Sequence, residues 1–520
     1  MRDTMQRLFG RRPLVTILGG GLFAFLLGIG LYVEMEQMSL LAAVILGCIL
    51  ILPFSLLLRK LFEWEYHGKG QEKVRALRPQ MIWGILFCCY LPALFVFFPG
   101  IFAYDVPFQL KQFFTGTFST HHPLLHTVLI GTMISGGKAV GNVTAGAALY
   151  TVIQMALVAI CFTGCIRSVA RMAKHKGMLW PLVFYALYPL HMIMAVNATK
   201  DTLFAACFAW MICLLIEESQ KSLSSFNKGM LVLTTIGSVL LRNNAIYALG
   251  AWAVFALAVS RNKRRVLAFL GILCLGTVFG ISLKLGLKAQ DGDVVEMLSL
   301  PIQQVARARL YAKEKLTDEE LQKIDGIMPG EAWTYYDPTV SDPVKFEVDS
   351  SQIRSNPGEY LQLYLSVLRK CPKESFDAAA ELMHGFLFPY FKYRVSGRYI
   401  QTENTEDYYD DWWTGEKIRN ASFFPRLRTA IEWRFGAQGA MQWPWIGIFF
   451  NMGVIVWATI FLCMRMMYWG NRDAALVTLI PLLLLGTYLL GPVMTGRYVY
   501  PFVCMIPGLT SVGGRNDETR

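Results

Sequence analysis

Apolar stretches long enough to cross a membrane recur along this chain from Pro13 to Gly514. A hydrocarbon core of about 30 Å needs roughly 20 helical residues, because the backbone must satisfy its own hydrogen bonds there. Only 17% of the residues are charged, and soluble chains carry roughly a quarter. These features predict an all-α polytopic membrane protein, and they exclude collagen, disordered chains, disulfide-stapled secreted domains and soluble Rossmann enzymes.

The hydropathy pattern predicts about 12 transmembrane helices and one polar insertion. The chain divides into an N-terminal transmembrane region (1–286), an extracytoplasmic, mostly helical insertion (287–441) and a C-terminal transmembrane region (442–520). The segment 123–140 is apolar but contains Gly136-Gly137-Lys138, and we expect it to be an interfacial helix. We expect the other apolar segment, 376–391, to be interfacial as well. The predicted spans are 13–33, 38–58, 81–99, 142–166, 178–196, 201–216, 229–241, 243–259, 266–286, 442–464, 474–492 and 498–513.

Basic residues set the predicted orientation. If 123–140 does not cross, about half of the 49 Lys and Arg fall in connections on one side, which the positive-inside rule makes cytoplasmic. If it crossed, the basic clusters at 167–176 and 261–265 would move outside. We therefore expect a multi-pass plasma-membrane protein with both termini cytoplasmic. The net charge of +12 then reflects topology and not nucleic-acid binding, and the insertion is net acidic.

The first substantial outer loop, 100–141, contains a candidate catalytic residue. Asp105 follows Tyr104 a few residues beyond the apolar end of a span. A carboxylate held near the headgroup plane can act as a general base or as a metal ligand. An equally weighted alternative is that Asp105 only caps the helix starting near Pro107.

Three of the chain's seven His lie within six residues in the same loop. His121 and His122 are adjacent, so we expect their rings to face different directions and not to chelate one ion together. One imidazole can donate to an anionic phosphate while the other, or His126, orients it. The alternative is a hydrated interfacial polar cluster.

Several further polar residues fall on the predicted outer face. Lys200, Arg242 with Asn243, and Arg497 each adjoin the end of a span. A single Arg at a helix end commonly snorkels to the interface. Several cations on the side that holds Asp105 instead favour a pocket for a phosphorylated ligand, because guanidinium and ammonium groups pair with phosphate oxygens. Asp201 beside Lys200 is expected to be a helix cap.

Near the end of the insertion, Asp410 and Asp411 precede Trp412 and Trp413. Carboxylates accept hydrogen bonds from sugar hydroxyls and indole rings stack on pyranose faces, so these four residues are weak candidates for sugar or acceptor binding. Anchoring of the loop at the interface by its aromatic residues is at least as strong an interpretation. The sequence has no phosphate-binding glycine loop, no dinucleotide fingerprint and no zinc spacing.

The order of these motifs resembles the GT-C glycosyltransferases, membrane enzymes that use polyprenyl-phosphate sugars. The resemblance is to the protein O-mannosyltransferase and aminoarabinose-transferase branch and to an uncharacterised Gram-positive group of it. It extends over most of the chain and rests on the order of the motifs. The motifs are Tyr104-Asp105, His121-His122-Pro123, Thr199-Lys200-Asp201, Arg242-Asn243-Asn244, the segment 301–307 and Gly496-Arg497-Tyr498.

The resemblance implies a GT-C-like bundle and a glycosyltransferase active site on the extracytoplasmic face. It implies that Asp105 deprotonates an acceptor hydroxyl and that His121 and His122 face the donor phosphate. The expected activity moves one sugar from a polyprenyl-phosphate donor to a hydroxyl of a cell-envelope acceptor, with Mg²⁺ or Mn²⁺ as an optional cofactor. The alternatives are a lipid-linked oligosaccharide ligase or polymerase, and a non-enzymatic transporter or flippase of the same lipid.

Overall fold

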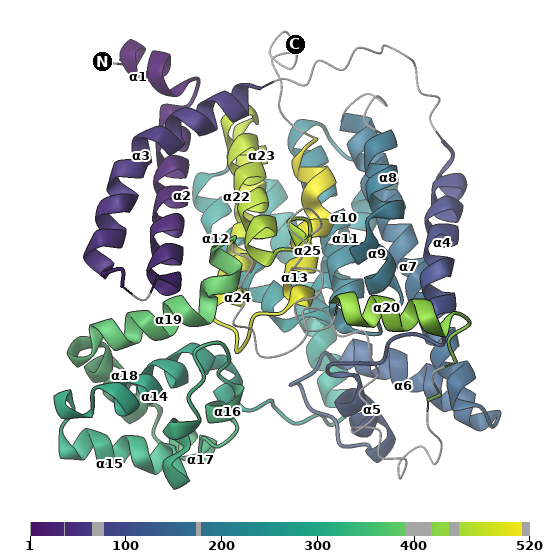
Figure 1. The fold of residues 1–520 in the computed structure, drawn as a ribbon. Helices are drawn as coiled ribbons and strands as arrows, with labels where there is room; N and C mark the ends of the chain where they lie inside the picture. The colour runs from purple at the N-terminus through teal and green to yellow at the C-terminus, as the bar shows by residue number, and fades with distance from the viewer. Residues whose placement is uncertain are drawn as a thin grey trace.

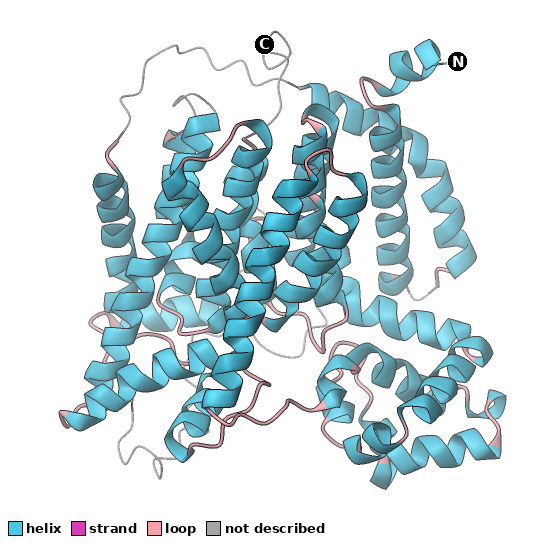
Figure 2. Ribbon diagram, turned by 180° about the vertical axis from the view of Figure 1, so that it is seen from behind, coloured by secondary structure: helices cyan, strands magenta, loops and turns pink. Residues whose placement is uncertain are grey.

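The computed structural model describes residues 2–35, 37–64, 77–172, 178–389, 418–419, 421–435 and 447–511. Most of these residues are helical, with loops between the helices, and none of them forms a strand, as Figures 1 and 2 show. Eight of the described helices are long and apolar enough to cross a membrane. The prediction of an all-α polytopic membrane protein is confirmed at this level, and the number 12 stays a prediction.

The N-terminal region contains helices α1 to α13. Helix starts follow local signals: Pro13, Pro79 and Pro107 lie in first turns, where a missing N–H costs nothing, and Ser39 and Ser224 cap their helices. The helices are α1 (Arg2–Phe9), α2 (Pro13–Glu34), α3 (Leu40–Glu63), α4 (Pro79–Val96), α5 (Val106–Thr115), α6 (Leu124–Ala139), α7 (Val143–Met172), α8 (Leu179–Leu187), α9 (Pro189–Ala195), α10 (Lys200–Gln220), α11 (Ser225–Leu241), α12 (Asn243–Val259) and α13 (Lys263–Gly286).

The insertion is helical and has its own hydrophobic core, which includes Ile302, Val305 and Val367. The predicted helix start at Thr317 is confirmed, because Thr317 and Glu320 form a complete capping box. The elements are η1 (Val294–Met297), α14 (Ser299–Tyr311), η2 (Lys313–Lys315), α15 (Asp318–Ile327), η3 (Pro329–Tyr335), α16 (Asp342–Lys345), α17 (Ser350–Ser355), α18 (Pro357–Lys370), α19 (Pro372–Leu387) and α20 (Pro425–Phe435).

The C-terminal region consists of α22 (Met452–Trp469), α23 (Arg472–Val477), α24 (Leu479–Leu489) and α25 (Gly496–Leu509). Two expected continuous spans differ in detail. The segment 178–196 breaks into α8 and α9 at Tyr188-Pro189, because a residue before proline is driven out of the α region. The segment 474–492 is divided into α23 and α24 at Thr478.

Helix α10 lies at the centre of the bundle, packed by α7, α11 and α25. It is the most buried of the eight candidate spans, and 83% of its apolar window is inside the protein. Helices α2 and α3 form a closely packed hairpin at the side of the bundle (Figure 1). A side chain at Gly28 would collide with the Ala43 carbonyl oxygen, so glycine is required for this approach.

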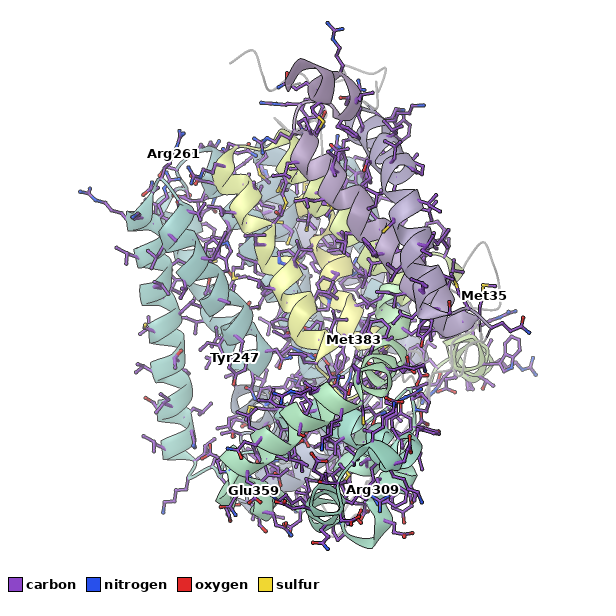
Figure 3. All side chains as sticks on the ribbon, turned by 90° about the vertical axis from the view of Figure 1, so that its left-hand side faces the viewer. Met35, Tyr247, Arg261, Arg309, Glu359 and Met383 are labelled. Carbon is purple, nitrogen blue, oxygen red and sulfur yellow. The ribbon has the colours of Figure 1, made fainter. Side chains whose placement is uncertain are left out.

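The connections sort into two ends of the bundle. Helices α5, α6 and α14 to α18 lie at one end, which we call the insertion end, and α1 lies at the opposite end (Figure 1). Figure 3 shows Arg261 at the opposite end from Arg309 and Glu359 of the insertion. An ion pair also joins two helix ends at the opposite end: Arg171 Nε, in the last turn of α7, lies 2.6 Å from Glu217 Oε1, near the end of α10. The connections thus gather at two ends of the bundle (Figures 1 and 3), and which end faces the cytoplasm stays a prediction.

Helix α6 lies across the insertion end beside α5 (Figures 1 and 2). It has 16 residues and is not among the eight candidate spans. Helix α19 connects the insertion to the bundle: the Tyr32 hydroxyl of α2 donates to Asp377 at 2.6 Å, and Trp457 Nε1 of α22 donates to the Leu387 carbonyl at 2.7 Å. The helix expected over 376–391 starts earlier, at Pro372, and ends at Leu387. It packs against α14 of the insertion and against α2 and α22 of the bundle.

Candidate functional site

Four segments that are distant in sequence meet at the insertion end. The strand-like segment at Ile101 pairs with the turn before α10: Ile101 N donates to Val196 O at 2.9 Å and Ala198 N donates to Ile101 O at 2.8 Å. This pairing sets the start of α5 beside the start of α10. The first turns of α12 and α25 reach the same place, because both helices contribute ion pairs to it.

Asp105 occupies the N-cap position of α5, but its side chain makes no capping hydrogen bond. Its Oδ2 atom instead lies 2.8 Å from Lys200 Nζ and 3.1 Å from Arg497 Nη1. Both cations belong to other helices, at the starts of α10 and α25. The interpretation of Asp105 as a simple helix cap is therefore wrong.

A second carboxylate extends this arrangement. Asp201 is fully buried, and its Oδ2 lies 3.6 Å from Arg497 Nη1. Its other oxygen pairs with Arg242. Lys200, Asp105, Arg497, Asp201 and Arg242 thus form a continuous series of alternating charges, which we call the charge chain. Its three cations outnumber its two carboxylates, so the charge chain carries a net positive charge.

Aromatic rings hold the two guanidinium groups in place. The Arg497 guanidinium lies 4.4 Å from the Tyr104 ring centre, and that of Arg242 lies 4.5 Å and 4.7 Å from the rings of Tyr488 and Tyr498. Such cation–π contacts are stronger when desolvated. Tyr104 adopts φ of 56°, a left-handed conformation that is strained for an aromatic residue. A strained backbone conformation persists only where surrounding contacts hold it in place. At Tyr104 this conformation occurs in the residue whose ring lies against the Arg497 guanidinium.

The charges act on the titration of the neighbouring groups. Burial alone would raise the pKa of Asp105, but the adjacent Arg497 and Lys200 cations hold this pKa well below its usual range. Burial and the Lys200 cation together lower the pKa of His122 well below its usual value. At neutral pH the site therefore contains an ionised Asp105 carboxylate and a neutral His122 imidazole.

Several buried polar atoms around the charge chain have no hydrogen-bond partner among the described residues. They include Nε of Arg497, Nε of Arg242, Nδ1 of His122 and Oγ1 of Thr495. A buried donor without a partner costs roughly 1–3 kcal/mol. Four unpaired polar atoms in and beside a positively charged cluster therefore favour a bound anion, which accepts hydrogen bonds and offsets the charge.

The structure brings most of the predicted site residues together and separates two of them. Five of the predicted residues form the charge chain or lie against it: Tyr104, Asp105, Lys200, Arg242 and Arg497. His122 lies close enough to Asp105 for the carboxylate charge to influence the pKa of His122.

Asn243 and His121 have different surroundings. Asn243 Nδ2 donates to the Thr120 carbonyl at 3.1 Å, so it attaches the loop before α6 to the start of α12. His121 is 41% exposed, and its Nδ1 lies 3.9 Å from Glu296 of the insertion.

The two adjacent imidazoles face different directions, as expected. The rings of His121 and His122 lie edge to face with their centres 4.3 Å apart, because both residues precede α6 in a turn and not in its first helical turn. His126 does not orient either ring. It is fully buried and hydrogen-bonded to Gln109 at 3.0 Å and to the Tyr150 hydroxyl at 2.8 Å, which joins α5, α6 and α7.

Two residues of the site were not predicted. Asp201 was expected only to cap α10, a role that belongs to Thr199, whose hydroxyl accepts from the Asp201 N–H. Thr495 precedes α25 without a side-chain capping bond, and its hydroxyl is buried. The signal for Asp201 was present in the sequence, because an acidic residue at the start of an apolar span commonly faces the bundle interior and pairs with a cation.

Asp410, Asp411, Trp412 and Trp413 lie outside the described residues, so their proposed sugar contacts stay a prediction. Among the residues that the structure describes, no group of three His, Cys, Asp or Glu is arranged to hold a metal ion. Asp105 already faces two cations, and these surroundings do not fit a ligand of a divalent metal.

Comparisons with other proteins give a family and no activity. Neither the comparison with curated proteins nor that with solved structures found a match. One family model, described as a family of unknown function (DUF6020), matches residues 113–518. The match includes Lys200, Asp201, Arg242 and Arg497 of the charge chain and begins after Asp105. Because it covers well over half of the chain, the protein belongs to the DUF6020 family.

Proposed function

We propose that this protein is a GT-C-type membrane glycosyltransferase. It takes a sugar from a polyprenyl-phosphate donor and transfers it to a hydroxyl of a cell-envelope acceptor, a glycopolymer, lipid or protein, on the extracytoplasmic face. The observation that carries the proposal is the charge chain, in which Lys200 and Arg497 share one oxygen of Asp105 and the cations are in excess. This site suits a phosphodiester next to a carboxylate.

The chemistry needs both signs of charge. The acceptor oxygen attacks the anomeric carbon of the sugar, a new C–O bond forms, and the bond from that carbon to the phosphate oxygen breaks. The leaving polyprenyl phosphate gains negative charge, which Arg497 and Lys200 stabilise. The acceptor hydroxyl loses its proton to the Asp105 carboxylate. No nucleotide is consumed, in agreement with the absence of nucleotide-binding motifs from the sequence.

The low pKa of Asp105 makes it a weak base while it holds both cations. A donor phosphate that pairs with Arg497 and Lys200 competes with Asp105 for them. The cations then depress the pKa of Asp105 less, and the carboxylate becomes a stronger base when the donor is bound. In this scheme Asp201 acts indirectly: it holds Arg497 and Arg242 in position and does not touch the phosphate.

The test is sugar transfer by the purified full-length chain from a panel of polyprenyl-phosphate sugars, with release of polyprenyl phosphate as the readout. Asp105→Asn is the inactive variant. Asp325→Asn is the matched control, because Asp325 also pairs with an arginine, Arg309, at 2.9 Å, but lies in the insertion. Equal activity of both variants would refute the assigned role of Asp105. Transbilayer movement of the lipid without any sugar transfer would favour the flippase alternative instead.

A further inference from the structure

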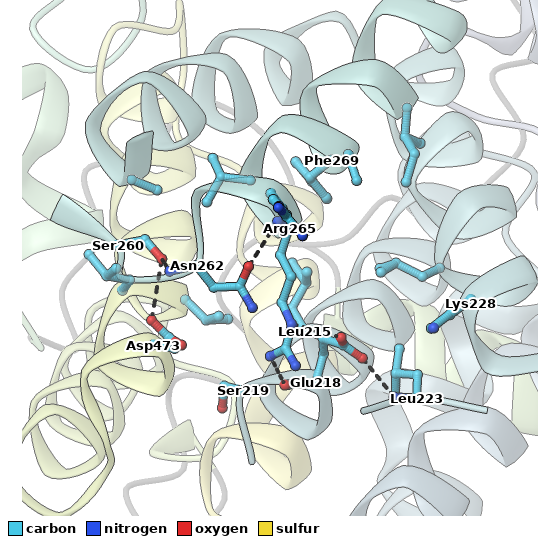
Figure 4. A pocket seen from close by; sticks show the side chains of 18 of the residues that line it. Leu215, Glu218, Ser219, Leu223, Lys228, Ser260, Asn262, Arg265, Phe269 and Asp473 are labelled. Atoms are coloured by element: carbon cyan, nitrogen blue, oxygen red, sulfur yellow. Dashed lines mark hydrogen bonds and ion pairs between the residues drawn. The ribbon is translucent and has the colours of Figure 1, made fainter. Parts of the chain in front are cut away.

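A second site lies at the end of the bundle opposite to the insertion. A cavity of about 460 Å³ opens between the ends of α10, α11, α12, α13 and α23 (Figure 4). None of its lining residues belongs to the charge chain, so the two sites are separate. The cavity has polar residues at one part of its wall and apolar residues along the rest.

Three basic and two acidic side chains line the polar part. One cation and one acid neutralise each other, because Arg265 Nε lies 3.2 Å from Glu218 Oε1. The second acid, Asp473, accepts from the Ser260 hydroxyl at 3.4 Å (Figure 4). Arg265 also donates to the Glu218 carbonyl at 2.8 Å, which fixes its guanidinium at the wall.

The remaining two cations are Lys228 of α11 and Arg264 of α13. Both side chains are exposed, and neither forms an ion pair or hydrogen bond with any residue that the structure describes. Both line the cavity, one from α11 and the other from α13. An anionic group between them would interact favourably with both.

The apolar part of the wall continues from these cations along α11 and α13. It includes Leu231, Val232 and Ile272. The outward residues of the same helices, such as Leu233 and Leu267, are more than half exposed and apolar. Two helices with apolar outer surfaces suit a bilayer, so the cavity combines a cationic rim with walls that suit hydrocarbon chains.

We propose that this cavity binds the headgroup and upper acyl chains of an anionic phospholipid from the leaflet at this end of the bundle. The phosphate lies between Lys228 and Arg264, and the acyl chains lie against Leu231, Val232 and Ile272. A soluble anion would use the cations but not the apolar wall, and a neutral lipid would use the wall but not the cations. The bound lipid connects α11 to α13 and stabilises their packing.

The test is native mass spectrometry of the purified full-length chain titrated with phosphatidylglycerol. We expect the double variant K228Q/R264Q to bind this lipid more than tenfold more weakly, since each substitution removes a charge-assisted hydrogen bond to the phosphate, and loss of one such bond corresponds to roughly tenfold or more. The matched control is K221Q/R261Q, which removes the same charge from exposed residues of the same end that do not line the cavity. We expect this control to change the affinity less than twofold.

A steric variant tests the cavity independently of charge. Ala268 lines the cavity and is exposed, so A268F fills space without disturbing the core. We expect it to weaken phosphatidylglycerol binding while all cations remain. Equal losses in the two double variants would overturn the proposal, as would unchanged binding by A268F. Displacement of the lipid by glycerol phosphate at the same concentration would show a soluble-anion site and overturn it as well.

Discussion

Replacing Arg497 by Ala removes the central cation of the charge chain. The guanidinium contacts Asp105 at 3.1 Å and Asp201 at 3.6 Å, and only 10% of the side chain is exposed. A hydrogen bond to a charged group contributes roughly 1.5–3 kcal/mol. If Arg497 makes one such bond to the donor phosphate, the loss corresponds to about 10- to 150-fold in affinity, at about 1.4 kcal/mol per factor of ten.

The assay is equilibrium binding of a polyprenyl phosphate to each purified variant. Arg497→Lys should recover part of the affinity, because a point charge replaces the planar fork. The matched control is Arg309→Ala: Arg309 pairs with Asp325 at 2.9 Å and lies 4.4 Å from the Trp333 ring centre, so it has similar surroundings within the insertion.

The unfolding temperature of each variant separates lost binding from lost structure. A folded Arg497→Ala protein that binds polyprenyl phosphate as tightly as the Arg309→Ala control would refute the assignment of the charge chain to the donor. It would leave the proposed lipid cavity at the opposite end of the bundle unaffected, because the two sites share no residue.

Four other predictions follow from the same geometry. Asp105→Asn should keep or tighten donor binding, because it removes the carboxylate that competes for the cations, and should lower turnover roughly 100-fold or more in a transfer assay, the usual scale for a positioned base. The donor releases Asp105 from its cations and raises its pKa, so donor binding is linked to proton uptake only near and below the pKa of Asp105 in the donor complex. Affinity for a phosphodiester donor should be flat near pH 7 and rise as the pH falls through that pKa, and Asp105→Asn should abolish the rise. A cysteine at Glu319 should react with an impermeant reagent in intact cells and one at Arg261 only after permeabilisation; the reverse would invert the predicted topology. Burial opposes ionisation of Glu320, but the hydrogen bonds from Lys370, Ser366 and the capping box lower the pKa of Glu320 to about 2. The ionised carboxylate therefore stabilises the fold above about pH 4.5, and this contribution is lost as the pH falls towards 2. Glu320→Gln should lower the unfolding temperature at pH 7 and leave it unchanged at pH 2.

Much of the fold could be predicted from local sequence. Span positions follow from hydropathy, since an apolar run in a bilayer has no stable alternative to a helix. Helix starts follow from short-range signals, such as the Thr317 and Glu320 capping box. The break at Tyr188-Pro189 was equally local and was missed, because hydropathy averages over a window and does not register a single backbone restriction.

Sidedness is the other property that the sequence determined. Each connection joins two spans, so an excess of Lys and Arg in a connection assigns that connection to one end of the bundle. Polar residues assigned to the same end then become candidates for one site. This reasoning selected Asp105, Lys200, Arg242 and Arg497 without any contact information. It identified residue types and an end of the bundle, and it could not identify partners.

Tertiary structure decided the partners. Arg497 and Asp105 are almost four hundred positions apart, and their pairing depends on how α25 and α5 meet α10, which no periodicity records. The same packing pairs Arg242 with Asp201 and with the rings of Tyr488 and Tyr498. It also directs the Asn243 side chain to the Thr120 carbonyl and not to the charge chain. Hydrophobicity acts on each segment separately, so the sequence shows which helices form; charge pairing acts between segments, so only the assembled bundle shows which charges meet.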